Sequence, residues 1–309
     1  MKKQFVTIFA LTLYAHLSFA QVKSLDAIPN DESWKNKISR IAPQTTVAPI
    51  SKEHKVLLFS LFTGYDHWVI PHAETVITML AEKTAAYNVV KSNDISMFEK
   101  KILKQFDAIV LNNNCSVGDR RDLFYDALGS IVNLKEDERE YKAAELEKNL
   151  ISFVKNGGGL FVIHGGIVMQ NNSADFSEML GGSFDYHPPQ QEIELQIVEE
   201  DHPLTKAFEG KSFTHVDEPY FFKNAYAKKN FRPLLFMDIS RIQQMRNETE
   251  EKVSYVSWIK KYGKGRVFYV SPSHNAQSYE DARMLKYYLN GMQYILGDLE
   301  CDDSPLKNQ

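Results

Sequence analysis

Residues 157–166 read Gly-Gly-Gly-Leu-Phe-Val-Ile-His-Gly-Gly, and this stretch determines the fold that we expect. A short, continuously apolar run is typical of a parallel strand buried on both faces. The glycines after His164 favour a sharp strand-to-helix turn that presents one side chain at the sheet edge, as in a nucleophile elbow. The spacing of a dinucleotide-binding loop is absent, so we expect no NAD and no nucleotide cofactor.

Strand and helix patterns alternate along the chain up to this stretch. Apolar runs predict strands at 55–62, 88–91, 107–111 and 158–163, and helical spacing predicts helices at 71–86, 97–105 and 140–155. Residues 112–139 are a polar insertion without a clear pattern. The alternation predicts an α/β fold with a doubly wound, mostly parallel sheet, in which ligands bind beyond the carboxyl ends of the strands.

The C-terminal half is richer in strand patterns. They occur at 192–198, 231–237, 253–259 and 266–271, before a closing helix at 278–297. We therefore expect a β-rich insertion in this half of the chain, within a single domain.

The ends of the chain differ from its centre. Residues 1–20 have a basic start, an apolar segment and a small-residue cleavage site ending at Ala20, which is the pattern of a secretory signal peptide. We expect cleavage near Ala20 and a periplasmic or secreted protein. Residues 21–54 are predicted to be an N-terminal arm, 55–300 the folded domain and 301–309 a tail. No later stretch is apolar enough to predict a membrane span.

The composition excludes several classes of function. The 309 residues are 43% hydrophobic and 25% charged, as in globular proteins, and a net charge of −4 gives no basic surface for nucleic acid. The two cysteines, Cys115 and Cys301, lack the spacing of a thiolate zinc site or a redox motif, and the sequence leaves open whether they pair.

Three of the nine histidines follow predicted strands. His67 comes after the first strand, His164 after the fourth and His274 after the last. Because the carboxyl ends of parallel strands meet at one edge of the sheet, these side chains can converge on one crevice. A single histidine is more often structural, but three at strand ends favour a site, since imidazole serves as base, acid or metal ligand near neutral pH.

The elbow and the last strand together resemble the class I glutamine amidotransferase-like fold. In that group the elbow residue is a cysteine and a His-Pro-Glu sequence completes the triad. Here His164 occupies the elbow, and Asn275 and Ala276 follow His274. Without the thiol and the carboxylate, glutaminase chemistry is excluded.

The chain resembles the ThuA-like (trehalose utilisation) family more closely, over about residues 55–298. The matching motifs are Gly64-Tyr-Asp-His67, the 157–164 strand, Leu180-Gly-Gly-Ser-Phe184 with His187, Asp201-His-Pro-Leu204, Asp217-Glu-Pro-Tyr220, Trp258, and Tyr262-Gly-Lys-Gly-Arg266 leading to His274. Two positions depart from the family. Ser273 replaces the usual glycine before the last histidine, and Tyr65-Asp66 stands where Phe-Arg is common.

The resemblance implies a fold of the flavodoxin and class I glutamine amidotransferase type, and a role in sugar catabolism through 3-keto derivatives of disaccharides and glucosides. A ketone at C3 acidifies the C2 proton, so a base can form an enolate that either expels the C1 substituent or is reprotonated. The expected enzyme is a lyase, hydrolase or isomerase for keto-sugar glycosides. A sugar 3-dehydrogenase is the implied functional partner; the oligomeric state stays open.

On this basis the candidate catalytic residues are His164, His274 and Glu218. A divalent metal ion, zinc or manganese, is a candidate cofactor, with His67, His164, Glu218 and His274 as candidate ligands. His67, Tyr220, His187 and Trp258 are candidates for contacting the sugar, since sugar rings pack on aromatic faces.

Two alternatives remain at this stage. Trp258 lies in a strand pattern, for which core packing is the alternative to sugar contact. The whole chain could also be a non-catalytic carbohydrate-binding or metal-binding protein of the same fold, in which case replacing His164 would change only an affinity.

Overall fold

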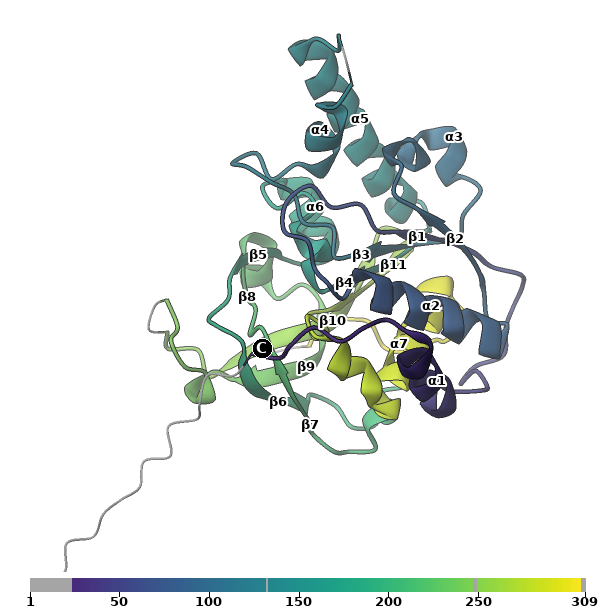
Figure 1. Cartoon of the computed structure of the whole chain (residues 1–309), viewed down its shortest axis with the longest axis vertical. Helices are drawn as coiled ribbons and strands as arrows, with labels where there is room; N and C mark the ends of the chain where they lie inside the picture. The colour runs from purple at the N-terminus through teal and green to yellow at the C-terminus, as the bar shows by residue number, and fades with distance from the viewer. Residues whose placement is uncertain (1–23, 132, 247–248, 307–309) are drawn as a thin grey trace, which may run out of the picture.

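The computed structural model describes residues 24–131, 133–246 and 249–306. The signal peptide expected at 1–20 lies outside these residues. Nine strands form one sheet in the order β2-β1-β3-β4-β11-β10-β9-β6-β7 (Figure 1). Its parallel part consists of β2 (Asn88–Ser92), β1 (Lys55–Phe59), β3 (Ala108–Asn112), β4 (Gly159–Ile163) and β11 (Gly265–Val270).

The β-rich half of the chain continues this sheet. The antiparallel strands are β10 (Val253–Tyr262), β9 (Arg232–Asp238), β6 (Gln191–Ile197) and β7 (Phe213–Asp217). A separate two-stranded sheet pairs β5 (Ser183–Tyr186) with β8 (Phe221–Lys223). The predicted α/β fold with a mostly parallel core is confirmed, and most of the expected β-rich insertion is an extension of the main sheet.

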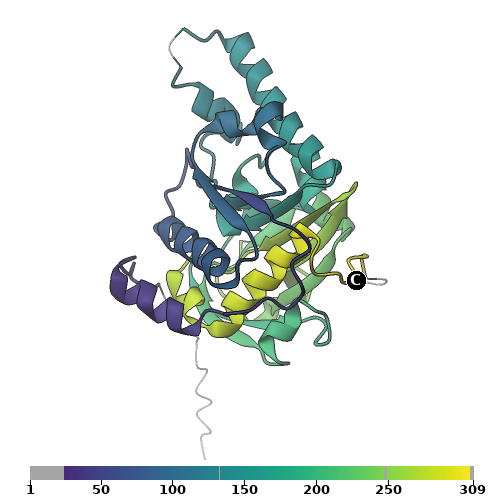
Figure 2. The ribbon, with the colours of Figure 1, turned by 90° about the vertical axis from the view of Figure 1, so that its right-hand side faces the viewer.

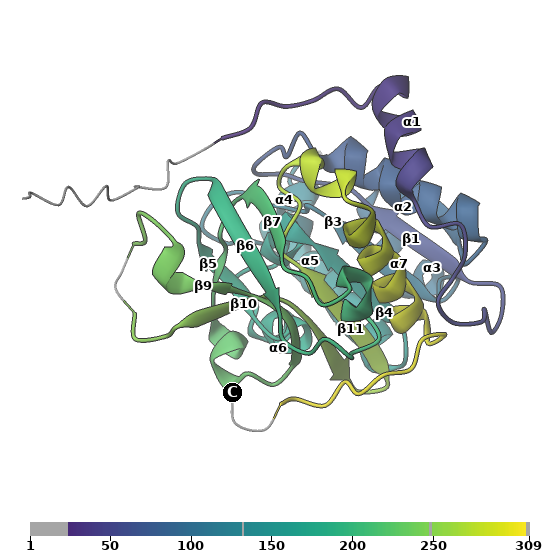
Figure 3. The ribbon, with the colours of Figure 1, turned by 90° about the horizontal axis from the view of Figure 1, so that it is seen from below.

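Helices cover both faces of the sheet. α1 (Glu32–Ile41), α2 (Ile70–Thr84) and α7 (Ala282–Leu296) lie side by side on one face (Figure 3). The other face carries α3 (Lys100–Leu103), α4 (Leu123–Leu128), α5 (Glu136–Lys155) and α6 (Ala174–Leu180). Alternate residues of a strand point to opposite faces, so Val56 and Leu58 enter one core while Leu57 and Phe59 enter the other.

Some elements differ from those expected. The N-terminal arm contains α1, which Asp31 caps by accepting the amide of Trp34. Trp34 then packs edge-on against the ring of His72, with centroids 4.6 Å apart. The unassigned polar insertion contains α4 and the first turn of α5, and the N-terminal end of α5 projects beyond the sheet (Figure 2, teal). No helix among the described residues is long and apolar enough to cross a membrane.

The order of the parallel strands reverses at one point of the sheet. The chain passes from β1 outward to β2 and then returns to β3 on the other side of β1, so the direction of winding reverses between β1 and β3. Ligands in open α/β sheets bind at such a reversal. The loops after β1, β3, β4 and β11 all open at this edge.

The hairpin from β10 to β11 fixes the strand that leads to His274. At its second glycine, Gly265, an added Cβ would overlap the carbonyl oxygen of Val154 and come within 2.5 Å of that of Gly158. Because both atoms belong to the backbone, no side-chain rotation could relieve the contact. Glycine is therefore required here by the close approach of α5.

We expect Gly265→Ala to lower the free energy of unfolding by about 3 kcal/mol, because the methyl group would force the backbone of α5 away from β11. The urea midpoint of unfolding measures this. The neighbouring exposed Lys264→Ala is the matched control and should change stability by less than about 0.5 kcal/mol. Equal midpoints for the two variants would contradict the packing argument.

Candidate active site

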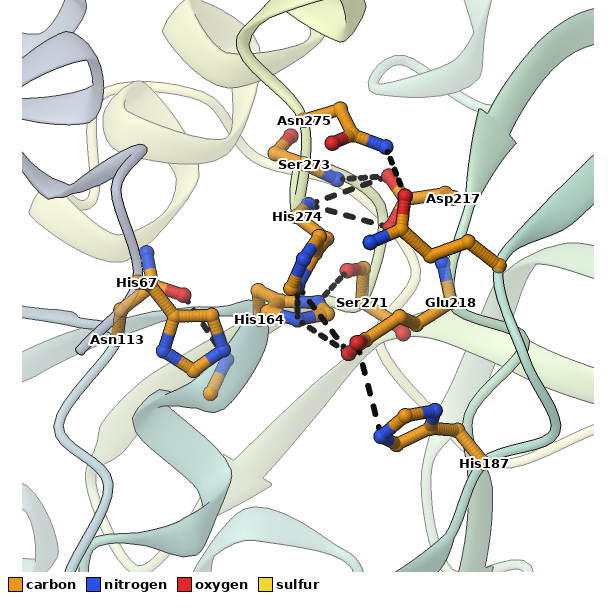
Figure 4. A network of polar contacts seen from close by, with 12 residues as sticks. His67, Asn113, His164, His187, Asp217, Glu218, Ser271, Ser273, His274 and Asn275 are labelled. Atoms are coloured by element: carbon orange, nitrogen blue, oxygen red, sulfur yellow. Dashed lines mark hydrogen bonds and ion pairs between the residues drawn. The ribbon is translucent and has the colours of Figure 1, made fainter. Parts of the chain in front are cut away.

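Three histidine rings meet at the carboxyl edge of the parallel strands (Figure 4). His67 comes from the loop after β1, His164 from the end of β4 and His274 from the loop after β11. Their ring centroids lie 5.1 to 5.3 Å apart, and each residue is at most 2% exposed. The structure thus brings together the three histidines that the strand order placed at this edge.

His164 occupies a sharp turn between β4 and the 3₁₀ helix η2 (His164–Val168). Its own φ is +43°, so the left-handed residue of the elbow is the histidine and not one of the glycines that follow it. Gly165 is needed for a different reason. A Cβ there would lie 2.7 Å from Cε1 of His67 and 2.9 Å from Sγ of Cys115, so a side chain would push these groups off the elbow.

The ring of His164 is oriented by a backbone carbonyl. Its Nδ1 lies 2.6 Å from the carbonyl oxygen of Ser271, and since that oxygen can only accept, Nδ1 carries the proton. Nε2 is the nitrogen that faces Glu218 and His274 in the centre of the cluster. A second nitrogen fixed in this way is the usual arrangement for a histidine that binds a metal ion.

Glu218 supplies the carboxylate of the cluster. Its Oε2 lies 3.4 Å from Nε2 of His164 and 3.2 Å from Nδ1 of His274. Its Oε1 lies 3.6 Å from Nε2 of His187, on the more exposed side. Burial acts to raise the pKa of Glu218, but its hydrogen bonds with His164 and His274 outweigh burial and hold that pKa below its usual value, so the group is ionised at neutral pH.

Two histidine pKa values shift in opposite directions. Burial, together with the neighbouring rings of His164 and His274, lowers the pKa of His67 to about 2, so this ring is neutral at pH 7. For His274, burial acts to lower the pKa, but the Glu218 carboxylate outweighs it and the pKa is raised. Cys115 lies beside the cluster, 3.9 Å from Nδ1 of His67, and burial raises the pKa of its thiol to about 12. Both cysteines are free.

Asp217, which the sequence did not single out as a site residue, holds the loop of His274 in place. Its buried carboxylate accepts the amides of Glu218 and Ser273, both at 2.8 Å, and that of His274 at 3.2 Å. Ser273 has φ = +111°, a conformation that glycine adopts readily and serine only under strain. The departure from glycine at this position was visible in the sequence; the carboxylate that compensates for it was not.

The cluster fits a divalent metal ion. One ligand atom from each of His67, His164, Glu218 and His274 lies within 4.8 Å of the others. Nε2 of His164, Nδ1 of His274 and Oε2 of Glu218 form a triangle with sides of 3.2 to 3.4 Å. A point equidistant from all three lies about 2 Å from each, which matches a zinc–nitrogen or zinc–oxygen bond.

The predicted sugar-contacting residues separate into two groups. His187 and Tyr220 stand beside the cluster, with the ring of Tyr220 tilted against that of His164 at 4.3 Å and the side chain of His187 35% exposed. Trp258 is fully buried, packs on Phe231 and donates Nε1 to the carbonyl of Leu180 at 2.7 Å. The sugar-contact prediction for Trp258 does not fit this position, and the alternative of core packing describes it.

Comparisons with solved structures show the same fold. A ThuA-like protein from Bacteroides uniformis is 17% identical with a TM-score of 0.57, over 81% of this chain and 92% of that one. A ThuA-like protein from Parabacteroides merdae is 16% identical with a TM-score of 0.54, over 82% and 98%. A cytoplasmic protein from Salmonella typhimurium is 16% identical with a TM-score of 0.51, over 78% and 98%.

The sequence itself was compared in two ways. Among curated proteins no significant match was found. The family model of ThuA, described as trehalose utilisation, matches residues 55–295. This range contains every strand of the sheet and all four residues of the histidine–glutamate cluster. The chain therefore belongs to the ThuA family.

Proposed function

We propose that this protein is an exported enzyme that acts on keto-sugar glycosides, such as 3-keto-disaccharides or 3-keto-glucosides. The observation that carries the proposal is the cluster of three buried imidazoles and one carboxylate at the ligand-binding edge of the sheet. The family's description, trehalose utilisation, supports a carbohydrate-related function. The apolar leader pattern of residues 1–20 supports export.

The reaction begins with the proton on C2, next to the ketone at C3. A base takes this proton, the C–H electron pair forms the C2–C3 double bond of an enolate, and the negative charge moves to the ketone oxygen. The enolate then expels the C1 substituent, whose oxygen leaves with a proton from an acid. His187 and Glu218, 3.6 Å apart on the exposed side of the cluster, are the pair that faces an incoming substrate.

In this proposal a divalent metal ion, zinc or manganese, would be held by His67, His164, Glu218 and His274. When bound, the ion would act as a Lewis acid for the ketone oxygen. The protein's own contribution is to keep the ligands ready. His67 is neutral because of its low pKa, and the Ser271 carbonyl fixes the tautomer of His164.

The enzyme proposal predicts proton exchange next to the ketone. With a 3-keto-glucoside in D₂O, we expect proton NMR to show deuterium at C2 or release of the aglycone in the wild type. His164→Ala should reduce the rate at least about 100-fold, because the cluster loses its central ligand.

His202→Gln is the matched control, because His202 is also buried but bonds to the carbonyl of Asp302, outside the cluster. It should retain the wild-type rate. If wild type and His164→Ala both leave several keto-glycosides unchanged, the protein is not this enzyme. Sugar binding without turnover would then favour the carbohydrate-binding alternative.

The metal proposal predicts one tight site. After EDTA treatment and dialysis, titration calorimetry should show one equivalent of zinc or manganese bound by the wild type. Glu218→Gln should weaken binding about 100-fold, while His202→Gln binds normally. Binding should be weaker at pH 5 than at pH 7, because imidazole must be deprotonated to act as a ligand. Equal affinity of Glu218→Gln and wild type would refute the ligand set.

A further inference from the structure

Tyr65 is an exposed aromatic side chain beside the histidine–glutamate cluster. Tyr65 is 59% exposed, yet its ring centroid lies 4.7 Å from that of His67 and 6.2 Å from that of His274. The ring is tilted by only 31° from the plane of His274.

The loop that carries Tyr65 is fixed on both sides. The amides of Thr63 and Gly64 both donate to the carbonyl of Cys115 at 2.9 Å, and a Cβ at Gly64 would lie 2.5 Å from the carbonyl oxygen of Ser116. On the other side, His67 is 2% exposed within the cluster. Tyr65 therefore projects from a short segment whose two ends are held, so little conformational entropy would be lost when a ligand packs against its ring.

A second group of aromatic rings borders the cluster beside His164 and Glu218. His187 and Tyr220 are stacked there at 5.7 Å, and Phe184 packs on Tyr220 at 4.6 Å. Tyr220 is 3% exposed, so its ring is largely covered by neighbours. By contrast, Tyr65 contributes little to the core. Its exposed ring is available to a ligand that reaches the histidines.

We propose that Tyr65 is the platform on which the sugar ring stacks, and that it selects six-membered sugar rings over open-chain sugars. This inference rests on the proposed function. A pyranose with equatorial hydroxyls presents a flat face of C–H groups, which suits the electron-rich face of a tyrosine ring. An open-chain polyol has no such face. The stacked ring would lie beside the cluster, where the carbon next to the ketone reacts.

The test compares Tyr65→Ala and Tyr65→Phe with wild type. Titration calorimetry with methyl β-glucoside, which has no ketone and cannot react, measures ring binding alone. We expect Tyr65→Ala to raise the dissociation constant about tenfold, as does the loss of one aromatic contact, and Tyr65→Phe to restore binding to within about threefold. With the 3-keto-glucoside, Tyr65→Ala should raise KM by a similar factor and change kcat much less.

Tyr141→Ala is the matched control, because Tyr141 is 65% exposed on α5, outside the site. It should bind and turn over as wild type does. Equal KM and equal affinity in wild type and Tyr65→Ala would overturn the role of Tyr65 while leaving the enzyme proposal intact. Equal loss of affinity for methyl β-glucoside and sorbitol would overturn the selection for rings. Absence of both sugar binding and turnover in the wild type would overturn both proposals.

Discussion

A single buried carboxylate joins the two loops on which the site depends. Asp217 ends β7, and its side chain accepts backbone amides from the loop after β11 as well as that of its neighbour Glu218. A buried carboxylate is costly unless its lone pairs are satisfied, and these amides satisfy them. The same bonds hold Ser273 at φ = +111° and so fix where His274 enters the cluster. The hydrogen bonds of Asp217 thus set both the conformation of the loop after β11 and the position of His274 in the cluster.

The two parts of the sheet contribute different chemistry. The parallel strands β1, β4 and β11 deliver three imidazole rings through His67, His164 and His274. The antiparallel part delivers the carboxylates, because Asp217 and Glu218 follow one another where β7 ends. The imidazoles and the carboxylates therefore meet only where the two parts of the sheet are correctly assembled. This arrangement also places the part-exposed His187 next to Glu218 and away from His67 (Figure 4).

The sequence predicted features that depend on one segment at a time. Apolar runs located the parallel strands, and so placed His67, His164 and His274 at one edge. The sequence did not reveal contacts between segments that lie far apart in the chain. The role of Asp217 requires knowing that β7 ends beside the loop of Ser273. For Trp258 the sequence left both sugar contact and core packing open, because an aromatic residue fits a strand pattern in either place. The polar arm concealed α1, since only Trp34 and Ile38 of that helix are buried.

The position of β11 determines when the sheet can be completed during synthesis. This strand is the last in the chain but lies in the middle of the sheet, between β4 and β10. A nascent chain that ends at Tyr262 contains four parallel and four antiparallel strands with nothing to join them. Neither the continuous sheet nor the cluster can form until the final segment leaves the ribosome. A chain truncated before residue 265 therefore lacks both the strand that joins the two parts of the sheet and His274, one of the four residues of the cluster.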